Sequence, residues 1–328
     1  MISREKQDLI KNWWEFGEQE EPLIIAAKCE NIPPKPEDLT AYWEDNRLRF
    51  DLFERQTALT EFLGVAVPFC YVDFGSSCMA GNLGCPMRYI NHETIWPRKL
   101  LNRIEEIPDA SIQEGSPWYR RVYDYLSLSL NRKDIVTACY ALGGIGDTIG
   151  SLYGEETLLT DMLDKPEDVK KAFRHIKHIW IQEYEKQVSL IKQSGQTGMC
   201  GWSGVWAPGG AFPVQEDMSY MLSPELFNQF CLPELMDIFE VIEYPMYHLD
   251  GKMAIFHLDS LLRIKKLKAV QWVPGAGNEE IAQWYPLLKR ILDAGKSIQI
   301  YATAQEVGDI VRNLGTRGVL VSLSFSCG

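Results

Sequence analysis

The sequence predicts an α/β fold, a TIM or (β/α)8 barrel with a helical N-terminal cap. From about residue 65 onward, short apolar runs typical of strands alternate with longer amphipathic runs typical of helices, and they give seven or eight strands. In addition, no Gly-x-Gly-x-x-Gly loop follows an early strand, as it would in an open dinucleotide-binding sheet. The segment Gly143-Gly144-Ile145-Gly146 lacks that spacing, and we interpret it as a tight turn.

Residues 1–64 are expected to form the helical cap, within the same domain as the barrel at 65–328. Two helix-like stretches rich in Trp, Glu and Arg, at 7–16 and 37–62, flank a short apolar run at 22–27. We expect this segment to cover one end of the barrel.

The predicted strands and helices then follow one another along the chain. Strands are expected at 65–74, 135–142, 196–206, 244–249, 269–273, 297–301 and 318–325. The longest helix is expected at 167–194, where apolar residues recur every three to four positions, with Pro166 in its first turn and Gly195 just beyond its end. Further helices are expected from Ser223-Pro224, with Ser223 as N-cap, and at 259–264, 279–294 and 304–314. Such alternation implies parallel strands joined by right-handed crossovers.

Charge and composition exclude several classes of partner. The net charge of −12, with no basic stripe, argues against binding to nucleic acid or to an anionic membrane. No apolar run reaches the roughly 18 residues that span a bilayer, and the start of the chain is charged rather than typical of a signal peptide. The eight cysteines lack disulfide spacing, so a reduced, cytoplasmic protein is expected. The oligomeric state stays open, a homodimer included.

A candidate metal site lies in the segment Tyr247-His248-Leu249-Asp250-Gly251. Residues i and i+2 of a strand point to the same face, so His248 and Asp250 are expected to converge. The apolar run at 319–325 is positioned to bring Cys327 to the same place. Imidazole, carboxylate and thiolate are zinc ligands, and three of them leave one position open for catalysis. The alternative is an ordinary buried His–Asp pair and a terminal cysteine without a role.

Other candidates follow predicted strands, where barrel enzymes carry their chemistry. Glu216 and Asp217 are candidate catalytic residues, as a further ligand, a general acid or a partner that orients His248; the alternative is a solvated acidic pair before a helix. The candidate substrate-binding residues are four aromatic side chains and one further histidine. They are Trp202, Trp206, Tyr247 and Trp272, together with His257. The aromatic group suits an aromatic ring, a sugar face or a quaternary ammonium group. His257 has the alternative of belonging to a capped turn.

Three segments carry a family resemblance. They are 135–163 with its Gly-rich turn, the acidic loop Gln215-Glu216-Asp217-Met218 with the Ser-Pro-Glu helix start at 223–225, and His248-Leu249-Asp250-Gly251. In these segments the chain resembles the uroporphyrinogen decarboxylase superfamily, which implies a TIM barrel. True decarboxylases of that family carry an arginine-rich N-terminal motif, which is absent before Glu37 here. A chain of charge −12 is also a poor host for a highly anionic porphyrinogen.

The chain is more similar to the superfamily's zinc-dependent methyltransferases, which act with a corrinoid protein or a thiol. Their zinc is held by His-x-Cys and a distant C-terminal cysteine. His248 and Cys327 match this pattern, and Asp250 replaces the middle cysteine. A carboxylate in that position leaves zinc harder and more electrophilic, which suits Lewis-acid activation of a substrate oxygen.

The resemblance therefore implies a demethylase. It would move a methyl group from a small O- or N-methylated substrate to the cobalamin of a corrinoid protein. The alternatives are a metal-free decarboxylase or lyase that uses His248 and Asp250 as an acid–base pair, and a non-catalytic barrel that binds a small aromatic or corrinoid compound.

Overall fold

Two largely parallel sheets form the centre of the fold, in a computed structural model that describes residues 2–29, 31–278 and 280–323. The larger sheet has the strand order β2-β1-β13-β12-β11-β10-β9, and the smaller has the order β3-β6-β7-β8. Only the β1–β2 and β7–β8 pairs within these sheets are antiparallel. A separate hairpin joins β4 to β5. The strands are β1 (Leu23–Cys29), β2 (Thr60–Gly64), β3 (Phe69–Tyr71), β4 (Met87–Tyr89), β5 (Ile95–Pro97), β6 (Val136–Ala138), β7 (Met199–Cys200), β8 (Trp206–Ala207), β9 (Ala211–Val214), β10 (Tyr244–Asp250), β11 (Ala269–Val273), β12 (Ser297–Ala302) and β13 (Val319–Leu323).

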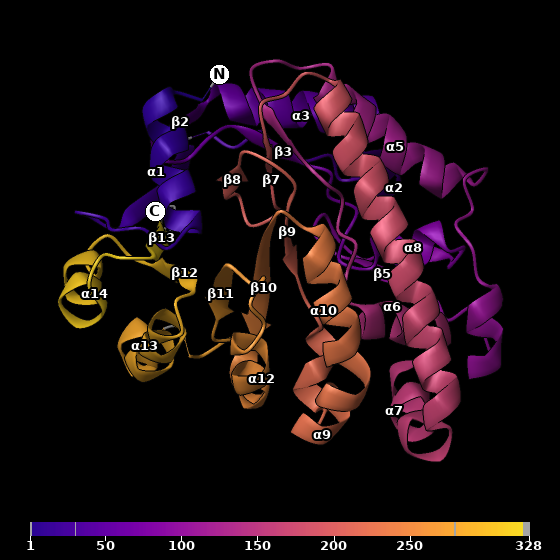
Figure 1. Cartoon of the computed structure of the whole chain (residues 1–328). Helices are drawn as coiled ribbons and strands as arrows, with labels where there is room; N and C mark the ends of the chain where they lie inside the picture. Colours follow the sequence, from indigo (N-terminus) through magenta and orange to yellow (C-terminus); the bar gives the residue numbers. More distant parts are fainter. Residues whose placement is uncertain (1, 30, 279, 324–328) are drawn as a thin grey trace.

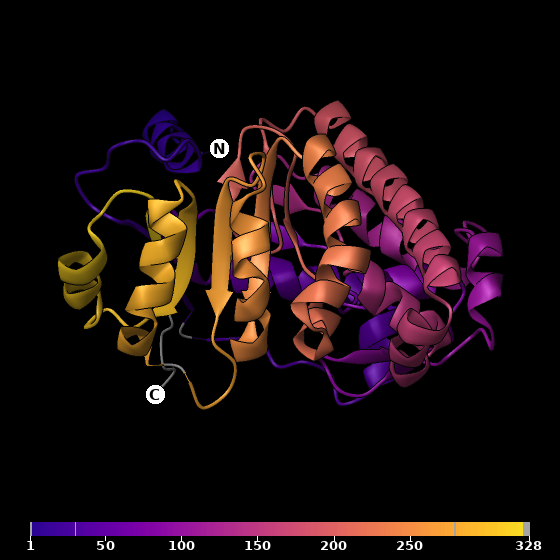
Figure 2. The same ribbon diagram turned by 60° about the horizontal axis from the view of Figure 1, so that its bottom comes forward.

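Helices lie along the outer side of these strands (Figure 1). In the C-terminal half, each strand from β9 to β12 is followed by a helical segment that leads to the next strand, and the turned view in Figure 2 shows these helices against one side of the sheet. The α-helices are α1 (Arg4–Trp14), α2 (Leu39–Glu44), α3 (Asn46–Ala58), α4 (Cys78–Asn82), α5 (Pro117–Leu130), α6 (Ile145–Tyr153), α7 (Glu155–Asp164), α8 (Pro166–Gln193), α9 (Pro224–Leu226), α10 (Leu232–Val241), α11 (Gly251–Ala254), α12 (Leu258–Leu262), α13 (Tyr285–Asp293) and α14 (Val307–Leu314). Short 3-10 or π segments are η1 (Ile104–Asp109), η2 (Asp217–Met221), η3 (Phe227–Cys231), η4 (Ile255–His257) and η5 (Ile281–Trp284).

This arrangement confirms a mixed α/β fold built on parallel sheets. Strands β9 to β13 are neighbours in chain order, as repeated βα units require. Among the described residues, backbone hydrogen bonds do not join the two sheets into one closed ring.

The N-terminal segment belongs to the larger sheet as well as covering it. Strand β1 pairs in parallel with β13, and β2 turns back along β1. The indole N–H of Trp13 on α1 donates to the carbonyl of Gly318 at 2.9 Å, and the Ser297 hydroxyl donates to the carbonyl of Trp13 at 2.6 Å. Both contacts lie where β12 and β13 begin, so α1 covers the amino ends of these strands. The predicted cap at 1–64 is therefore not purely helical.

The long helix α8 ends within a residue of its predicted bounds at both ends. Its apolar stripe is buried, as the three- to four-residue spacing predicts, and it includes Val169, Phe173, Ile176, Trp180 and Tyr184. The indole N–H of Trp180 donates to the carbonyl of Gly143 at 3.0 Å, which fixes the helix against the turn before α6.

The early strands are shorter than predicted. Strand β3 keeps three residues of the expected run at 65–74, and β6 keeps three of 135–142. Strand β9 was not predicted because Pro213 and the preceding glycine pair discourage a strand. Gly143 has a φ of +68°, which confirms the predicted turn, and α6 begins two residues later.

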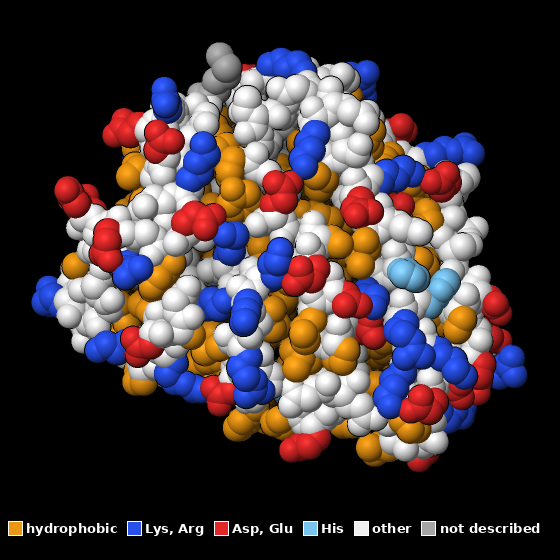
Figure 3. Space-filling model, viewed as in Figure 1, with side chains coloured by type: hydrophobic (Ala, Val, Ile, Leu, Met, Phe, Trp, Pro, Cys, Tyr) orange, Lys and Arg blue, Asp and Glu red, His pale blue; other side chains and the backbone are white. Residues whose placement is uncertain are grey.

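The face shown in Figure 3 carries charges of both signs, and the thiols of the described residues are free. On the face shown in Figure 3, basic and acidic side chains are interspersed and form no patch of a single sign. In the part of the chain that the structure describes, no helix combines the length and the apolar character that crossing a membrane requires. The seven cysteines described are free, and all but Cys29 are buried.

Candidate functional site

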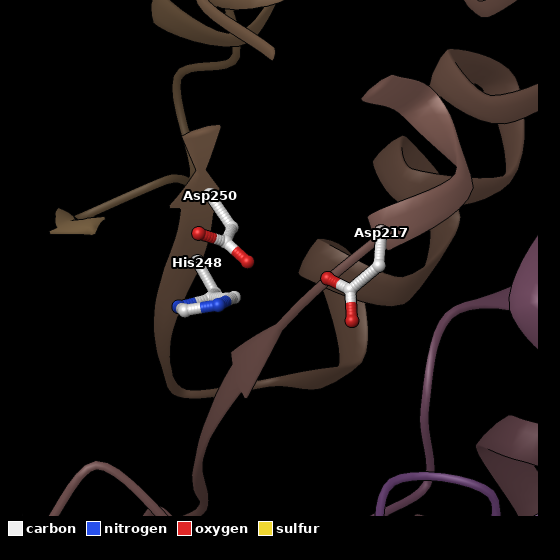
Figure 4. A group of neighbouring side chains, drawn as sticks. All are labelled: Asp217, His248 and Asp250. Atoms are coloured by element: carbon white, nitrogen blue, oxygen red, sulfur yellow. The ribbon is translucent and has the colours of Figure 1, made fainter. Parts of the chain in front are cut away.

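His248 and Asp250 leave the same face of β10 at its carboxyl end (Figure 4). Gly251 follows with a φ of +76°, in the left-handed region that favours glycine. A Cβ at this position would lie 3.0 Å from the Tyr220 ring. The glycine therefore turns the chain out of the strand immediately after Asp250 and allows η2 to pack close by.

Asp217 faces this pair from the start of η2 (Figure 4). Donor atoms of Asp217, His248 and Asp250 all lie within 4.8 Å of one another. One imidazole and two carboxylates are a suitable donor set for a divalent metal such as zinc. They form a harder set than one that contains a thiolate. We call these three residues the triad.

A row of side chains across three strands orients the imidazole of the triad. The sheet register places His248 on β10, Gln271 on β11 and Gln299 on β12 side by side. The Oε1 atom of Gln271 lies 2.6 Å from Nδ1 of His248, and Nε2 of Gln271 donates to Oε1 of Gln299 at 3.1 Å. Gln299 in turn donates to the backbone carbonyl of Ser203 at 3.0 Å.

That backbone carbonyl determines the direction of every hydrogen bond in the row. Because a carbonyl oxygen only accepts, Gln299 presents its nitrogen to Ser203 and its oxygen to Gln271. Gln271 then presents its oxygen to His248, so Nδ1 carries the proton. The Nε2 lone pair is left for a metal or for a proton. Burial lowers the pKa of His248, which favours the same neutral imidazole.

Asp147, at the start of α6, holds the backbone that carries Asp217. Its carboxylate accepts the backbone N–H groups of Asp217 at 2.9 Å and Met218 at 2.7 Å. Burial, and then the Asp217 charge, raise the pKa of Asp147. Asp217 reaches solvent, yet protein surrounds its carboxyl group closely enough that burial, followed by the charge of Asp250, raises its pKa as well. A divalent cation would relieve this concentration of negative charge.

Glu216 has a structural position rather than a catalytic one. It is 2% exposed, and its carboxylate accepts the backbone N–H groups of Ile145 at 2.5 Å and Gly146 at 3.0 Å. A Cβ at Gly146 would lie 2.0 Å from the sulfur of Met218, so only glycine permits this approach. Glu216 therefore caps α6 and anchors the segment that carries Asp217. It lies outside the triad.

With this geometry established, comparisons place the fold among known proteins. No family model matches the chain, and no curated protein matches it. Among solved structures, a methyltransferase from Methanosarcina mazei superposes with a TM-score of 0.60 at 10% sequence identity, covering 97% of this chain and 92% of that one. The chain shares the fold of a methyltransferase. At this identity the likeness concerns the fold.

Trp202 is the predicted aromatic residue that lies beside the triad. Its ring meets the His248 ring edge-on, with 5.0 Å between centroids. The indole N–H donates to the carbonyl of Pro213 at 2.8 Å, which holds the ring in place. Trp202 thus forms one wall of the site.

Tyr247 and Trp272 lie on the opposite face of the sheet from the triad. Side chains alternate along a strand, so the residues next to His248 and Gln271 point toward the helices. Tyr247 is 1% exposed, and Trp272 is fully buried with its ring edge-on to Trp284 at 4.9 Å. The prediction that these two rings line the same pocket as His248 is therefore wrong.

Trp206 lies toward the amino ends of the strands. Strand β8 runs antiparallel to β7, which carries the chain back from the carboxyl edge. The ring stands over Gly198, where a Cβ would lie 2.6 Å from the indole nitrogen. Its backbone carbonyl accepts the indole N–H of Trp14 at 2.9 Å. The expectation that Trp206 lines the site together with Trp202 is therefore wrong as well.

His257 packs beneath η2 and is 1% exposed. Its Nε2 lies 2.8 Å from the carbonyl of Ser219, and its ring stacks on Phe227 with 4.2 Å between centroids. The alternative interpretation, that His257 stabilises a turn, fits these contacts better than substrate binding. Cys327, the predicted sulfur ligand, lies outside the described residues.

Sequence interpretation assigned no role to Gln271, Gln299 or Asp147. A signal for the two glutamines was present, since each is the single amide in a mostly apolar strand, Ala269–Val273 or Ser297–Ala302. An amide on the inward face of a buried strand needs a polar partner. Asp147 carried no comparable signal, because its contact with the 217–218 backbone joins segments 70 residues apart.

Proposed function

We propose that the protein is a metal-dependent methyltransferase that moves a methyl group from a small O- or N-methylated substrate to a corrinoid protein. The observation that carries the proposal is the triad Asp217, His248 and Asp250, in a fold shared with a methyltransferase. The resemblance of the 215–227 and 248–251 segments to the uroporphyrinogen decarboxylase superfamily supports the corrinoid-linked branch.

Zinc is the proposed metal. The triad offers it one nitrogen and two oxygen donors from three side chains, and zinc accepts both kinds. The ligand set thus differs from the predicted one, because Asp217 joins His248 and Asp250. Cys327 stays a predicted further ligand. When bound, zinc would act as a Lewis acid toward the heteroatom that bears the methyl group.

The protein's own residues prepare this chemistry. The row that ends at the Ser203 carbonyl keeps Nε2 of His248 unprotonated and its ring fixed. Asp147 and Glu216 hold the 216–218 backbone, and so the Asp217 carboxylate, in position. Trp202 shields one side of the site from water and offers an aromatic edge to the substrate.

An exposed apolar rim beside the triad supports a protein partner. Tyr220, Met221, Met253 and Phe256 are 43–61% exposed. The first two follow Asp217 on η2, and the others follow Asp250 on α11 and η4. Helix α11 packs against both η2 and η4. Contiguous exposed apolar side chains are typical of interaction surfaces. A carrier docked here would bring its cobalt toward the triad, and methyl transfer needs an approach of roughly 3–3.5 Å.

We further propose that the two parallel sheets are arcs of one (β/α)8 barrel. Strand β9, at the edge of the larger sheet, is a close neighbour in space of β7 in the smaller sheet. Gln299 of the larger sheet also donates to Ser203, just after β7. Such contacts fit a barrel interior that both sheets share.

A metal-free lyase or decarboxylase is the second candidate. It is favoured by the opposite shifts of two neighbours, since the pKa of Asp217 is raised and that of His248 is lowered. These shifts would suit an acid–base pair working near neutral pH.

Zinc-dependent demethylation separates these candidates. Protein stripped with a chelator and reloaded with zinc is assayed for methyl transfer from methoxyarenes and methylamines to cob(I)alamin. We expect activity to require zinc, and Asp250→Asn to reduce it by at least about 100-fold. The chain provides a matched control nine residues on, where His257-Leu258-Asp259 repeats the triplet. Asp259→Asn, which loses only an exposed ion pair with Arg290, should keep full activity. Turnover of a substrate by the metal-free protein would favour the lyase, and binding without any turnover would favour a non-catalytic protein.

A further inference from the structure

Arg49, on α3, is a buried cation whose hydrogen bonds are incomplete. The residue is 6% exposed. Its Nη2 donates to the backbone carbonyl of Asp73, while Nε and Nη1 have no hydrogen-bond partner. No carboxylate of the described residues forms an ion pair with it. Because unsatisfied N–H groups on a buried charge are costly, a ligand that supplies an acceptor would stabilise Arg49.

Aromatic rings surround the guanidinium but supply no acceptor. Its Cζ lies 4.5 Å from the ring centroids of Trp43 and Phe74, 4.9 Å from that of Tyr125 and 5.4 Å from that of Tyr42. Cation–π contacts of this kind stabilise the positive charge. They leave the N–H groups of Nε and Nη1 without an acceptor.

A cavity of about 280 Å³ adjoins Arg49. It lies between α3, the segment that follows β1, and β3 at the edge of the smaller sheet. Its charged lining residues are Arg49, Lys35 and Asp73, so positive charge is in excess in a chain of net charge −12. Much of the remaining wall is apolar or aromatic, including Phe53 and Phe69.

We propose that this cavity binds a small monocarboxylate with an apolar body. The carboxylate accepts hydrogen bonds from the Arg49 guanidinium and the Lys35 ammonium group, and the body packs against Phe53 and Phe69. The volume suits a molecule about the size of benzoate rather than a nucleotide or a porphyrin. This site is separate from the triad, and its occupation requires neither a metal nor methyl transfer.

Isothermal titration calorimetry with benzoate and its neutral isostere benzamide tests the proposal. We expect benzoate to bind the full chain with a roughly millimolar or lower Kd, and benzamide at least about tenfold more weakly. Arg49→Gln should weaken benzoate binding by at least about tenfold. Arg47→Gln is the matched control, because it makes the same change on the same helix at an exposed position outside the cavity lining, and it should leave the Kd within about twofold.

Two further measurements keep the proposal open to refutation if Arg49→Gln does not fold. Lys35→Gln changes an exposed side chain and should weaken benzoate binding by about threefold or more. Crystals soaked in 4-iodobenzoate should show an anomalous iodine peak between Phe53 and Phe69. The proposal is overturned by equal affinities for benzoate and benzamide, by an iodine peak elsewhere or none at all, or by inorganic phosphate binding where benzoate does not.

Discussion

Nδ1 of His248 and Oε1 of Gln271 lie 2.6 Å apart on neighbouring strands, opposite each other in the sheet register. The contact decides which nitrogen of the histidine faces the carboxylates of the triad. Since Gln271 is itself directed by Gln299 and the Ser203 carbonyl, the orientation of His248 is determined from β12, two strands away from β10.

Removing the amide of Gln271 should lower the affinity of the triad for zinc. Gln271→Leu keeps a similar volume but deletes the acceptor for Nδ1, so the imidazole is free to rotate and to change tautomer. We expect zinc affinity, measured by competition with a chromophoric chelator, to fall by about 10- to 100-fold. Gln193→Leu, at the exposed end of α8, serves as the control. An unchanged affinity in a folded Gln271→Leu protein would show that the row does not orient His248.

Gly146 should tolerate no side chain. A Cβ there meets the Met218 sulfur at 2.0 Å and a Glu216 oxygen at 2.9 Å. Gly146→Ala is therefore expected to lower the free energy of unfolding by about 1–3 kcal/mol in urea titrations. Gly115→Ala is the control, since a Cβ there has no neighbour within 4 Å and should cost almost nothing. Equal stability of the two variants would mean that α6 and η2 are not tightly packed.

The stability of the metal-free protein should depend on pH through Asp217. Its pKa is raised to about 6 from the ordinary value of 3.8, so ionised Asp217 opposes folding. The contribution of the carboxyl group to stability is complete below about pH 4 and is lost as the pH rises through about 6. We expect metal-free Asp217→Asn to have a higher Tm than the natural protein at pH 7.5, and the difference to vanish near pH 4.

Zinc should stabilise the natural protein more than Asp217→Asn, which opposes the Tm difference expected for the metal-free proteins. At pH 7.5 and saturating zinc, the natural protein should gain more in Tm than Asp217→Asn, because the metal binds only the folded triad. In the pH series without metal, the difference in Tm between the natural protein and Asp217→Asn cancels the titration of the other carboxyl groups. A Tm difference between the two metal-free proteins that does not change with pH would contradict the burial of the Asp217 carboxyl group and its proximity to Asp250.

Trp202 and Trp272 should behave differently although both are tryptophans near the same strands. Trp202→Ala removes the ring beside His248 and should raise the KM of a methylated substrate by about 2- to 30-fold. Trp272→Phe changes the outer face and should lower stability while leaving KM unchanged. The reverse pattern in steady-state kinetics would show that the strand faces have been assigned wrongly.

Local periodicity was sufficient to predict the elements with the clearest apolar spacing. Helix α8 and strand β11 were predicted nearly to the residue, because apolar spacing and flanking Pro and Gly mark them. Strand β9 was missed because Pro213 and two glycines hide a strand that only its neighbour β10 stabilises. The closed barrel stays a prediction.

The part of the site that lies on a single strand was predictable from the sequence. Two-residue alternation gave His248 and Asp250, and the same rule, applied to Tyr247 and Trp272, would have placed them on the other face. The partners of the pair come from contacts distant in sequence, such as Asp147 with the backbone of Asp217. The antiparallel return of β8, which removes Trp206 from the site, likewise has no local signal.

Anomalous scattering at the zinc edge, from crystals grown with zinc, tests the central claim most directly. We expect one peak at about 2.0–2.2 Å from a nitrogen of His248 and from oxygens of Asp217 and Asp250. An ordered triad without a peak at saturating zinc, or a peak bound by other side chains, would contradict the account.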